Sequence, residues 1–263
     1  MHPQTAQFRI EVAGETNVGR KRNHNEDNFA IIADYGLFLV ADGMGGHAAG
    51  EVASKMALDS IQEFFAATQS DPERTWPYKM DRTKGYEENR LITGIKLANL
   101  RIYETAQRES KKRGMGTTFV GIFSANDGVY VAHVGDSRVY RFRAGALEML
   151  TEDHSLLNDY IKMKRLTEEE IANFPHKNVI VRALGMKESV QVDTMSDAFK
   201  VGDVYLMCSD GLSGMIDDPG LAQILSSESD LDRASEALIA KANANGGVDN
   251  ITCILARLEP LHS

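Results

Sequence analysis

Cysteine, proline and positive charge are all scarce in this 263-residue sequence, and the shortages narrow the class of protein. The two cysteines, Cys208 and Cys253, lie in apolar stretches typical of strands, and so few cysteines exclude a disulfide-rich scaffold. They could pair with each other, but we expect two buried free thiols. Asp and Glu outnumber Lys and Arg by 38 to 29, so the net charge of −9 argues against a nucleic-acid-binding surface.

Long hydrophobic runs and low-complexity tracts are also absent from the sequence. No run approaches the length of a membrane span, and the polar start lacks the apolar core of a signal peptide, so we expect a cytoplasmic protein with no membrane contact. With 43% hydrophobic residues, 25% charged residues and only 6 prolines, the composition is that of a globular protein. The length fits one large domain or two small ones.

Residues 37–46 combine an apolar stretch with an acid and three glycines. The apolar residues are typical of a buried strand and the glycines end it, so Asp42 lies at a strand end. Residues 28–34 predict a second strand, and a tight turn between the two makes them an antiparallel hairpin. Counting outward from that turn places Asp27 almost opposite Asp42, with Glu26 alongside.

Three acids this close together repel one another, which indicates that a bound cation neutralises them. Carboxylates are hard oxygen ligands, and without nearby His or Cys ligands they favour magnesium, manganese or calcium over zinc. A solvated loop that happens to be acidic is the alternative that the hairpin alone leaves open.

Acids stand at the ends of other strand-like stretches as well. Asp136 and Asp210 each stand two residues after the end of such a stretch, and Asp249 stands two residues before the start of one. Because the starts and ends of antiparallel neighbours share one edge of a sheet, we expect these three acids to converge with those of the hairpin. An acidic cluster beside an arginine, here Arg22, is typical of a two-metal hydrolase that acts on phosphate.

The remaining pattern predicts an α+β fold in which helices pack across sheets. Apolar residues at helical spacing predict two pairs of successive helices, at 47–65 and 88–113 and again at 219–225 and 231–244. Further strands are predicted at 8–13, 117–124, 129–134, 139–142, 203–208 and 251–258, with a polar loop at 14–26. A charged segment at 153–175 interrupts this pattern and predicts a helical excursion over the surface, with Thr167 capping its second helix.

Seven short motifs follow one another across almost the whole chain, at residues 22–27, 40–47, 116–118, 135–137, 182–185, 208–211 and 249–250. Each is weak alone, but in this order they resemble the motifs of the PPM metal-dependent protein serine/threonine phosphatases, the type 2C class, in their bacterial form. The resemblance implies a single domain over residues 1–263, with a central sandwich of two mostly antiparallel β-sheets flanked by pairs of antiparallel helices in four layers (αββα). The segment 153–175 matches the family's flap beside the active site.

The resemblance also implies roles for the metal-binding residues. Asp42 would bridge two Mn²⁺ or Mg²⁺ ions, with the carbonyl of Gly43 on one ion and the carboxylates of Asp210 and Asp249 on the other. A weaker third ion would bind at Asp136.

The remaining roles concern the substrate and the nucleophile. Arg22 would bind the substrate phosphate, and Glu26 and Asp27 would hold metal-bound waters. A metal-bridging hydroxide would attack phosphorus in line, without a covalent phosphoenzyme. The substrates would be phosphoserine and phosphothreonine in proteins. The enzyme would oppose a bacterial-type Ser/Thr kinase and would be a monomer.

Two positions depart from the pattern of other family members. Met44 stands where many eukaryotic members have a histidine, which leaves the general acid unassigned. His47 is close in sequence, but we expect a structural role for it at the helix start. Gly214 stands where some relatives carry a further acid, which predicts a low affinity for the third ion.

Two other functions are compatible with the resemblance. A catalytically inactive domain could bind a phosphoprotein as a regulatory module, although the presence of every motif acid argues against it. An enzyme of the same fold could instead act on a small phosphorylated metabolite.

Overall fold

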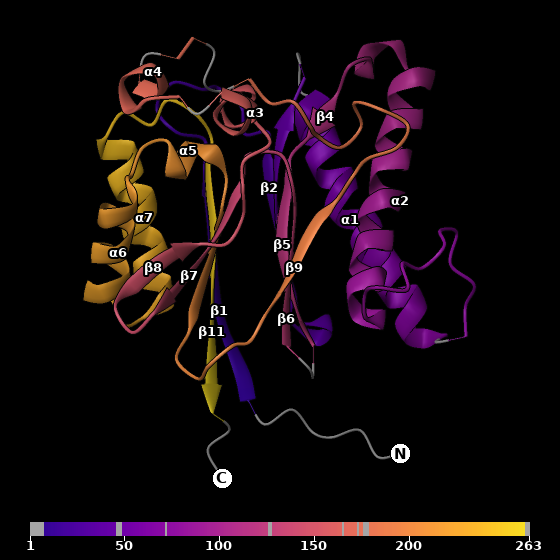
Figure 1. The fold of residues 1–263 in the computed structure, drawn as a ribbon, viewed down its shortest axis with the longest axis horizontal. Coiled ribbons are helices and arrows are strands. Elements are labelled where there is room, and N and C mark those ends of the chain that lie inside the picture. Colours follow the sequence, from indigo (N-terminus) through magenta and orange to yellow (C-terminus); the bar gives the residue numbers. More distant parts are fainter. Residues whose placement is uncertain are drawn as a thin grey trace.

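The computed structural model describes residues 8–45, 49–71, 73–125, 128–164, 166–172, 174–175 and 179–260. Two β-sheets face each other at the centre, with one pair of helices outside each sheet (Figure 1). This confirms the predicted α+β sandwich in four layers.

Every strand pairing in the two sheets is antiparallel. The first sheet has the order β1 (Phe8–Asn17), β11 (Ile251–Pro260), β10 (Val204–Cys208), β7 (Arg138–Arg143) and β8 (Ala146–Met149). The second has the order β2 (Asp27–Ile32), β3 (Leu37–Met44), β5 (Phe119–Ala125), β6 (Gly128–Val134) and β9 (Asp193–Asp197), with β4 (Gly116–Thr117) paired to β3.

The helices cover the outer faces of the sheets. On the second sheet lie α1 (Ala49–Ser70) and α2 (Tyr86–Arg108), and on the first lie α6 (Asp218–Ser227) and α7 (Leu231–Ala244) (Figure 1). Shorter helices are α3 (Leu156–Lys164), α4 (Glu168–Ala172), α5 (Asp210–Ser213) and the 3₁₀ turns η1 (Ala33–Tyr35) and η2 (Ser110–Lys112). Among the described residues, no helix is both long and apolar enough to span a bilayer.

Strand β3 is buried on both faces, which explains why its sequence is continuously apolar rather than alternating. Leu37 and Leu39 belong to the core between this sheet and the helices α1 and α2. Phe38 and Val40 belong to the core between the two sheets, which Tyr205 of β10 also joins. The strand is therefore held on two sides, and its last residues have a rigid base.

Several boundaries differ from the predicted ones. Strand β1 continues to Asn17, because Asn17 pairs with Ile251 of β11, so the loop predicted from residue 14 was wrong for its first four residues. The helix predicted at 88–113 ends at Arg108. Strands β8 and β9 were not predicted, because they are short sheet-edge strands without a clear apolar alternation. His47 lies outside the described residues.

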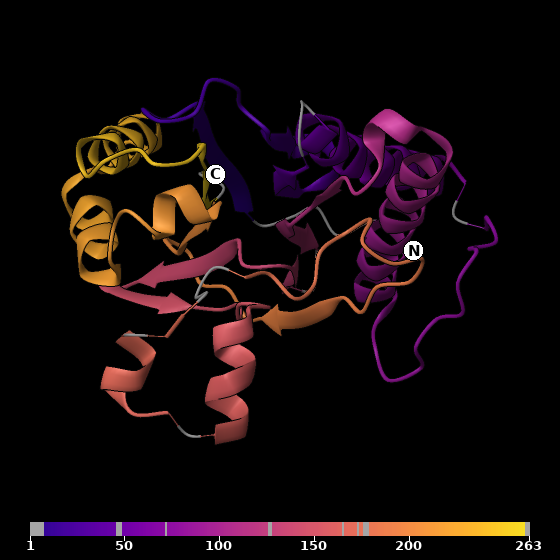
Figure 2. The same cartoon turned by 90° about the horizontal axis from the view of Figure 1, so that it is seen from above.

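Helices α3 and α4 project to one side of the sandwich, as predicted for residues 153–175 (Figure 2). The backbone N–H of Glu170 donates to Thr167 Oγ1 at 3.3 Å, and the carboxylate of Glu170 accepts the N–H of Thr167 at 2.8 Å. This reciprocal capping box confirms that Thr167 caps the second helix. The rings of Tyr160 and Phe174, 5.1 Å apart, connect α3 to the segment after α4.

Both cysteines are buried and free, as predicted. Cys208 and Cys253 face each other in the pairing of β10 with β11. Burial raises the pKa of the Cys208 thiol to about 12, so it stays protonated and unreactive near neutral pH.

Candidate metal centre

The predicted opposition of two acids in the first hairpin is confirmed. Asp27 at the start of β2 pairs directly with Asp42 near the end of β3. Asp27 is only 5% exposed, and Asp42 lies beside it in a strand whose other residues are almost all buried. Two carboxylates that face each other in a buried hairpin repel strongly unless protons or cations neutralise them.

The other predicted acids lie at the same edge. Burial raises the pKa of Asp42 well above its ordinary value, and the charges of Asp27, Asp210, Asp136 and Asp249 raise it further. Burial also raises the pKa of Asp210, and the charge of Asp249 adds to the rise. The other four aspartates are therefore all within electrostatic reach of Asp42.

Three of these carboxylates have a buried oxygen without a hydrogen-bond partner among the described residues: Asp27 Oδ1, Asp136 Oδ1 and Asp210 Oδ1. Buried polar atoms are otherwise almost always satisfied, and a bound ion is one of the ordinary reasons for an exception. Hard carboxylate oxygens that converge without His or Cys suit Mg²⁺ or Mn²⁺. The donor set therefore fits a cluster of divalent cations.

Hydrogen bonds fix one oxygen of Asp27 and leave the other available. Ser209 Oγ and Thr252 Oγ1 both donate to Asp27 Oδ2, at 2.8 and 2.7 Å. Sequence reasoning did not identify either donor. The signal was their position, because Ser209 lies in the motif at 208–211 and Thr252 lies two residues after the motif at 249–250.

The backbone of Asp42 is held by the motif at 116–118. Thr118 donates its backbone N–H to the carbonyl of Asp42 at 2.8 Å, and its Oγ1 accepts the N–H of Asp42 at 3.1 Å. Thr117 Oγ1 donates to the same carbonyl at 2.8 Å. These contacts orient Asp42 from the neighbouring strand β4 and from Thr118, the residue between β4 and β5.

Gly43 lies where the backbones of three segments meet. A Cβ at this position would come within 2.2 Å of the carbonyl oxygen of Gly50 and 2.5 Å of that of Glu26. Only glycine fits this close approach. The side chain of Glu26 is near as well, because its Oε1 accepts the N–H of Gly50 in the first turn of α1 at 3.2 Å.

Arg22 is the arginine beside the cluster. Its Nη2 lies 2.7 Å from Asp249 Oδ2, and half of its side chain is exposed. The guanidinium is thus fixed at one end by a carboxylate of the cluster and is open to solvent. This is the placement that a phosphate-binding arginine needs.

A cavity of about 250 Å³ adjoins the cluster, and its lining includes Asp136, Asp210 and Asp249. Gly214 also lines it, and a Cβ at that position would lie 2.8 Å from the carbonyl oxygen of Asp210. An acid in place of Gly214 would therefore require the backbone to shift. Met44 is half-buried at the end of β3 and carries no proton donor.

An antiparallel sandwich with a buried aspartate cluster at one edge is an architecture suited to metal-dependent hydrolysis. The chain belongs to the protein phosphatase 2C family, whose model matches residues 16–256. It is a protein serine/threonine phosphatase of the bacterial type.

Relatives of known activity cover nearly the whole chain. The serine/threonine phosphatase stp of Listeria monocytogenes is 38% identical over 247 residues, which cover 91% of this chain and 92% of the relative. The solved serine/threonine phosphatase of S. agalactiae has a TM-score of 0.83 at 35% identity, with 95% of this chain and 100% of that chain covered. The catalytic domain of the phosphatase PstP was solved in complex with two manganese ions. It has a TM-score of 0.78 at 30% identity, and the match covers 96% of this chain and 99% of that chain.

Proposed function

We propose that this phosphatase hydrolyses phosphoserine and phosphothreonine in proteins at the aspartate cluster, with two divalent cations. The observation that carries the proposal is a set of buried carboxylate oxygens beside an arginine that have no hydrogen-bond partner in the described part of the chain. When bound, the cations supply a hydroxide nucleophile at neutral pH and neutralise charge on the phosphate. Arg22 binds and orients that phosphate with its solvent-facing N–H groups.

Each acid has a proposed place at the cations. Asp42 would serve both cations, the carbonyl of Gly43 would serve one of them, and Asp210 and Asp249 would serve the other. The manganese complex of the relative PstP supports two Mn²⁺ ions, and Mg²⁺ is the alternative with the same ligand preference.

Three further acids complete the set. Glu26 and Asp27 would hold waters bound to the cations, and the hydrogen bonds that Ser209 and Thr252 donate to Asp27 keep it oriented. Asp136, together with Asp210, would hold a weaker third cation. The low affinity follows from Gly214, because no side chain there adds a ligand.

The wider role follows from the activity. The chain acts as one domain over residues 1–263, with 153–175 as a flap beside the active site that affects the choice of substrate. A cytoplasmic monomer in signalling that opposes a bacterial-type Ser/Thr kinase fits this activity, because such a kinase supplies its substrates.

The test is phosphate release from a phosphothreonine peptide with Mn²⁺, measured with and without excess chelator. We expect release that the chelator abolishes and that renewed Mn²⁺ restores. No release from folded protein under either condition would favour the phosphoprotein-binding module. Faster release from a small phosphorylated metabolite than from the peptide would favour the metabolite enzyme.

Replacing Arg22 by alanine is expected to raise the Michaelis constant for the peptide more than it lowers turnover. The reason is that the guanidinium contacts the phosphate in the ground state as well as in the transition state. Loss of one charge-assisted contact corresponds to about 1.5–3 kcal/mol, or roughly ten- to a hundredfold in kcat/KM. Steady-state kinetics with the phosphothreonine peptide measure both constants.

Lys21→Ala is the matched control for Arg22→Ala. Lys21 is the neighbouring exposed cation and has no part in the proposed site, so it should leave both constants within about twofold. An unchanged Michaelis constant in Arg22→Ala would contradict the phosphate-binding role.

A further inference from the structure

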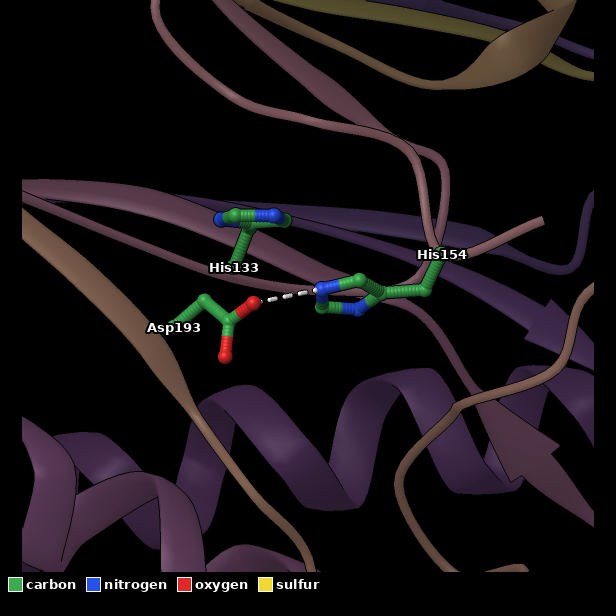
Figure 3. A group of neighbouring side chains, drawn as sticks. All are labelled: His133, His154 and Asp193. Atoms are coloured by element: carbon green, nitrogen blue, oxygen red, sulfur yellow. Dashed lines mark hydrogen bonds and ion pairs between the residues drawn. The ribbon is translucent and has the colours of Figure 1, made fainter. Parts of the chain in front are cut away.

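Two histidines and an acid form a second polar group beside the aspartate cluster. His133 on β6, His154 at the base of the 153–175 excursion and Asp193 on β9 lie side by side (Figure 3). One nitrogen or oxygen from each lies within 4.8 Å of the others, which resembles the ligand set of a transition metal. The hydrogen bonds around the group decide whether it can act as one.

Both nitrogens of His154 are already used. Nδ1 accepts the backbone N–H of Gly135 at 3.0 Å, so Nδ1 carries no proton. The proton is therefore on Nε2, which lies 3.0 Å from Asp193 Oδ2 and donates to it (Figure 3). Burial lowers the pKa of His154, which favours the neutral ring that this pattern requires.

The guanidinium group of Arg182 is the fourth member of this group. Arg182 Nη1 donates to Asp193 Oδ1 at 2.9 Å and lies 3.0 Å from His154 Nε2. His133 Nε2 lies 2.9 Å from the carbonyl oxygen of Glu152 and donates to it. The group is thus a hydrogen-bonded assembly around a neutral His154 rather than a metal site.

This hydrogen-bonded assembly fixes the backbone of Gly135 through His154. The backbone N–H of His154 donates to the carbonyl of Gly135 at 2.9 Å, while Nδ1 accepts the N–H of Gly135, so both peptide groups of the glycine are bound. Gly135 has a φ of +115°, and a Cβ there would lie 2.7 Å from Cβ of Thr118, so only glycine fits. Its backbone has little freedom on either side.

The residue after Gly135 is Asp136. It is 7% exposed, and its Oδ1 is one of the buried oxygens that no described residue hydrogen-bonds. On its other side, Ser137 Oγ lies 2.7 Å from Thr118 Oγ1 and shares a hydrogen bond with it. Asp136 therefore lies between two fixed points, of which His154 provides one.

We propose that His154 is a positioning residue for Asp136. The neutral imidazole, oriented by Asp193, holds the peptide of Gly135 and thereby aims the Asp136 carboxylate at the third cation. The inference rests on the proposed function, and it links the base of the 153–175 excursion to the weakest cation site.

The test is calorimetric titration of Mn²⁺ into wild type, Asp136→Asn, His154→Phe and His154→Asn. Phenylalanine preserves the ring that stacks on His133, at 4.6 Å between centroids, but cannot accept the N–H of Gly135. Asparagine carries an acceptor oxygen at the branch position of Nδ1. For wild type we expect a tight Mn²⁺-binding phase from the two main cations and a weak phase from the third. Asp136→Asn should abolish the weak phase, and His154→Phe should lower its affinity about tenfold or more, whereas His154→Asn should largely restore it. The affinity of the tight phase should be unchanged in all variants.

The outcomes separate the inference from the proposed function. A weak phase in His154→Phe equal to that of wild type, or no weak phase in wild type, would overturn the positioning role and leave the two tight cations in place. Absence of any Mn²⁺ binding would overturn the proposed function as well. If His154→Phe does not fold, the ¹⁵N spectrum of wild-type His154 decides, because a proton on Nδ1 would contradict the bond from Gly135 and a proton on Nε2 supports it.

Discussion

Asp42→Asn is expected to abolish phosphate release while leaving the protein folded. The substitution removes the carboxylate that both proposed cations share and preserves its shape. We expect kcat/KM to fall at least about a thousandfold, which corresponds to roughly 4 kcal/mol of transition-state stabilisation. Release from the phosphothreonine peptide at saturating Mn²⁺ measures the loss.

The stability of this variant provides a second, independent result. Asp42 lies among four other aspartates whose charges raise its pKa, so removal of its charge relieves repulsion. Without metal, the variant should be at least as stable to urea as wild type. Asp34→Asn is the matched control, because Asp34 is an exposed acid in the turn of the same hairpin and should leave activity unchanged. Undiminished activity of Asp42→Asn would refute the assignment of the site.

The metal-free protein should become less stable as the pH rises from 5 to 7, on account of Asp136. Burial, followed by the charge of Asp210, raises its pKa to about 7 in the folded state. In the unfolded chain an aspartate titrates at about 3.9, so the folded state binds more protons over this range. Stability then falls with rising pH, at most by roughly 1.4 kcal/mol per pH unit for this one carboxyl.

Asp136→Asn separates this contribution from those of other groups. Burial lowers the pKa of His133 and of His154. These histidines make the protein more stable as the pH rises to about 6.5, which is opposite to the effect of Asp136. Asp136→Asn leaves both histidines in place. Without metal, we expect the melting temperature of the variant to exceed that of wild type, and the excess to grow from pH 5 to pH 7.

With saturating Mn²⁺, the melting temperature of wild type should instead exceed that of Asp136→Asn. The cation replaces the proton on the carboxylate, so wild type should gain more from Mn²⁺ at pH 7 than at pH 5, by about 5 °C or more in melting temperature. Melting curves with chelator and with Mn²⁺ at three pH values measure this. A constant difference between wild type and Asp136→Asn across the pH range would contradict the raised pKa of Asp136.

The first hairpin shows how much local sequence can determine. A continuous apolar run, a short turn and the period of two in strands were enough to predict that Asp27 faces Asp42, and the pairing of β2 with β3 confirms it. The pattern succeeded because burial on both faces and a tight turn leave one register open to these residues. Apolar residues at helical spacing likewise predicted most helices, including α7 at its observed bounds.

The predictions failed where distant strands determine the structure. Nothing near Asn17 predicts a strand there, and β1 reaches it only because Ile251 lies opposite. Strand β9 is mostly polar and has no buried residue, and it forms because the edge of β6 is available to pair with it. Local periodicity carries no information about such partners.

The sequence by itself thus determined which acids stand at strand ends, since each is set by the few residues around it. Only the tertiary structure decided which groups support those acids. Ser209 and Thr252 reach Asp27 because β10 and β11 lie next to each other in the sheet that faces the first hairpin, and His154 reaches Gly135 because the chain returns to the end of β6 after β8. A hydrogen bond acts over about 3 Å in space irrespective of separation along the chain, so the order of strands in the two sheets determines these contacts.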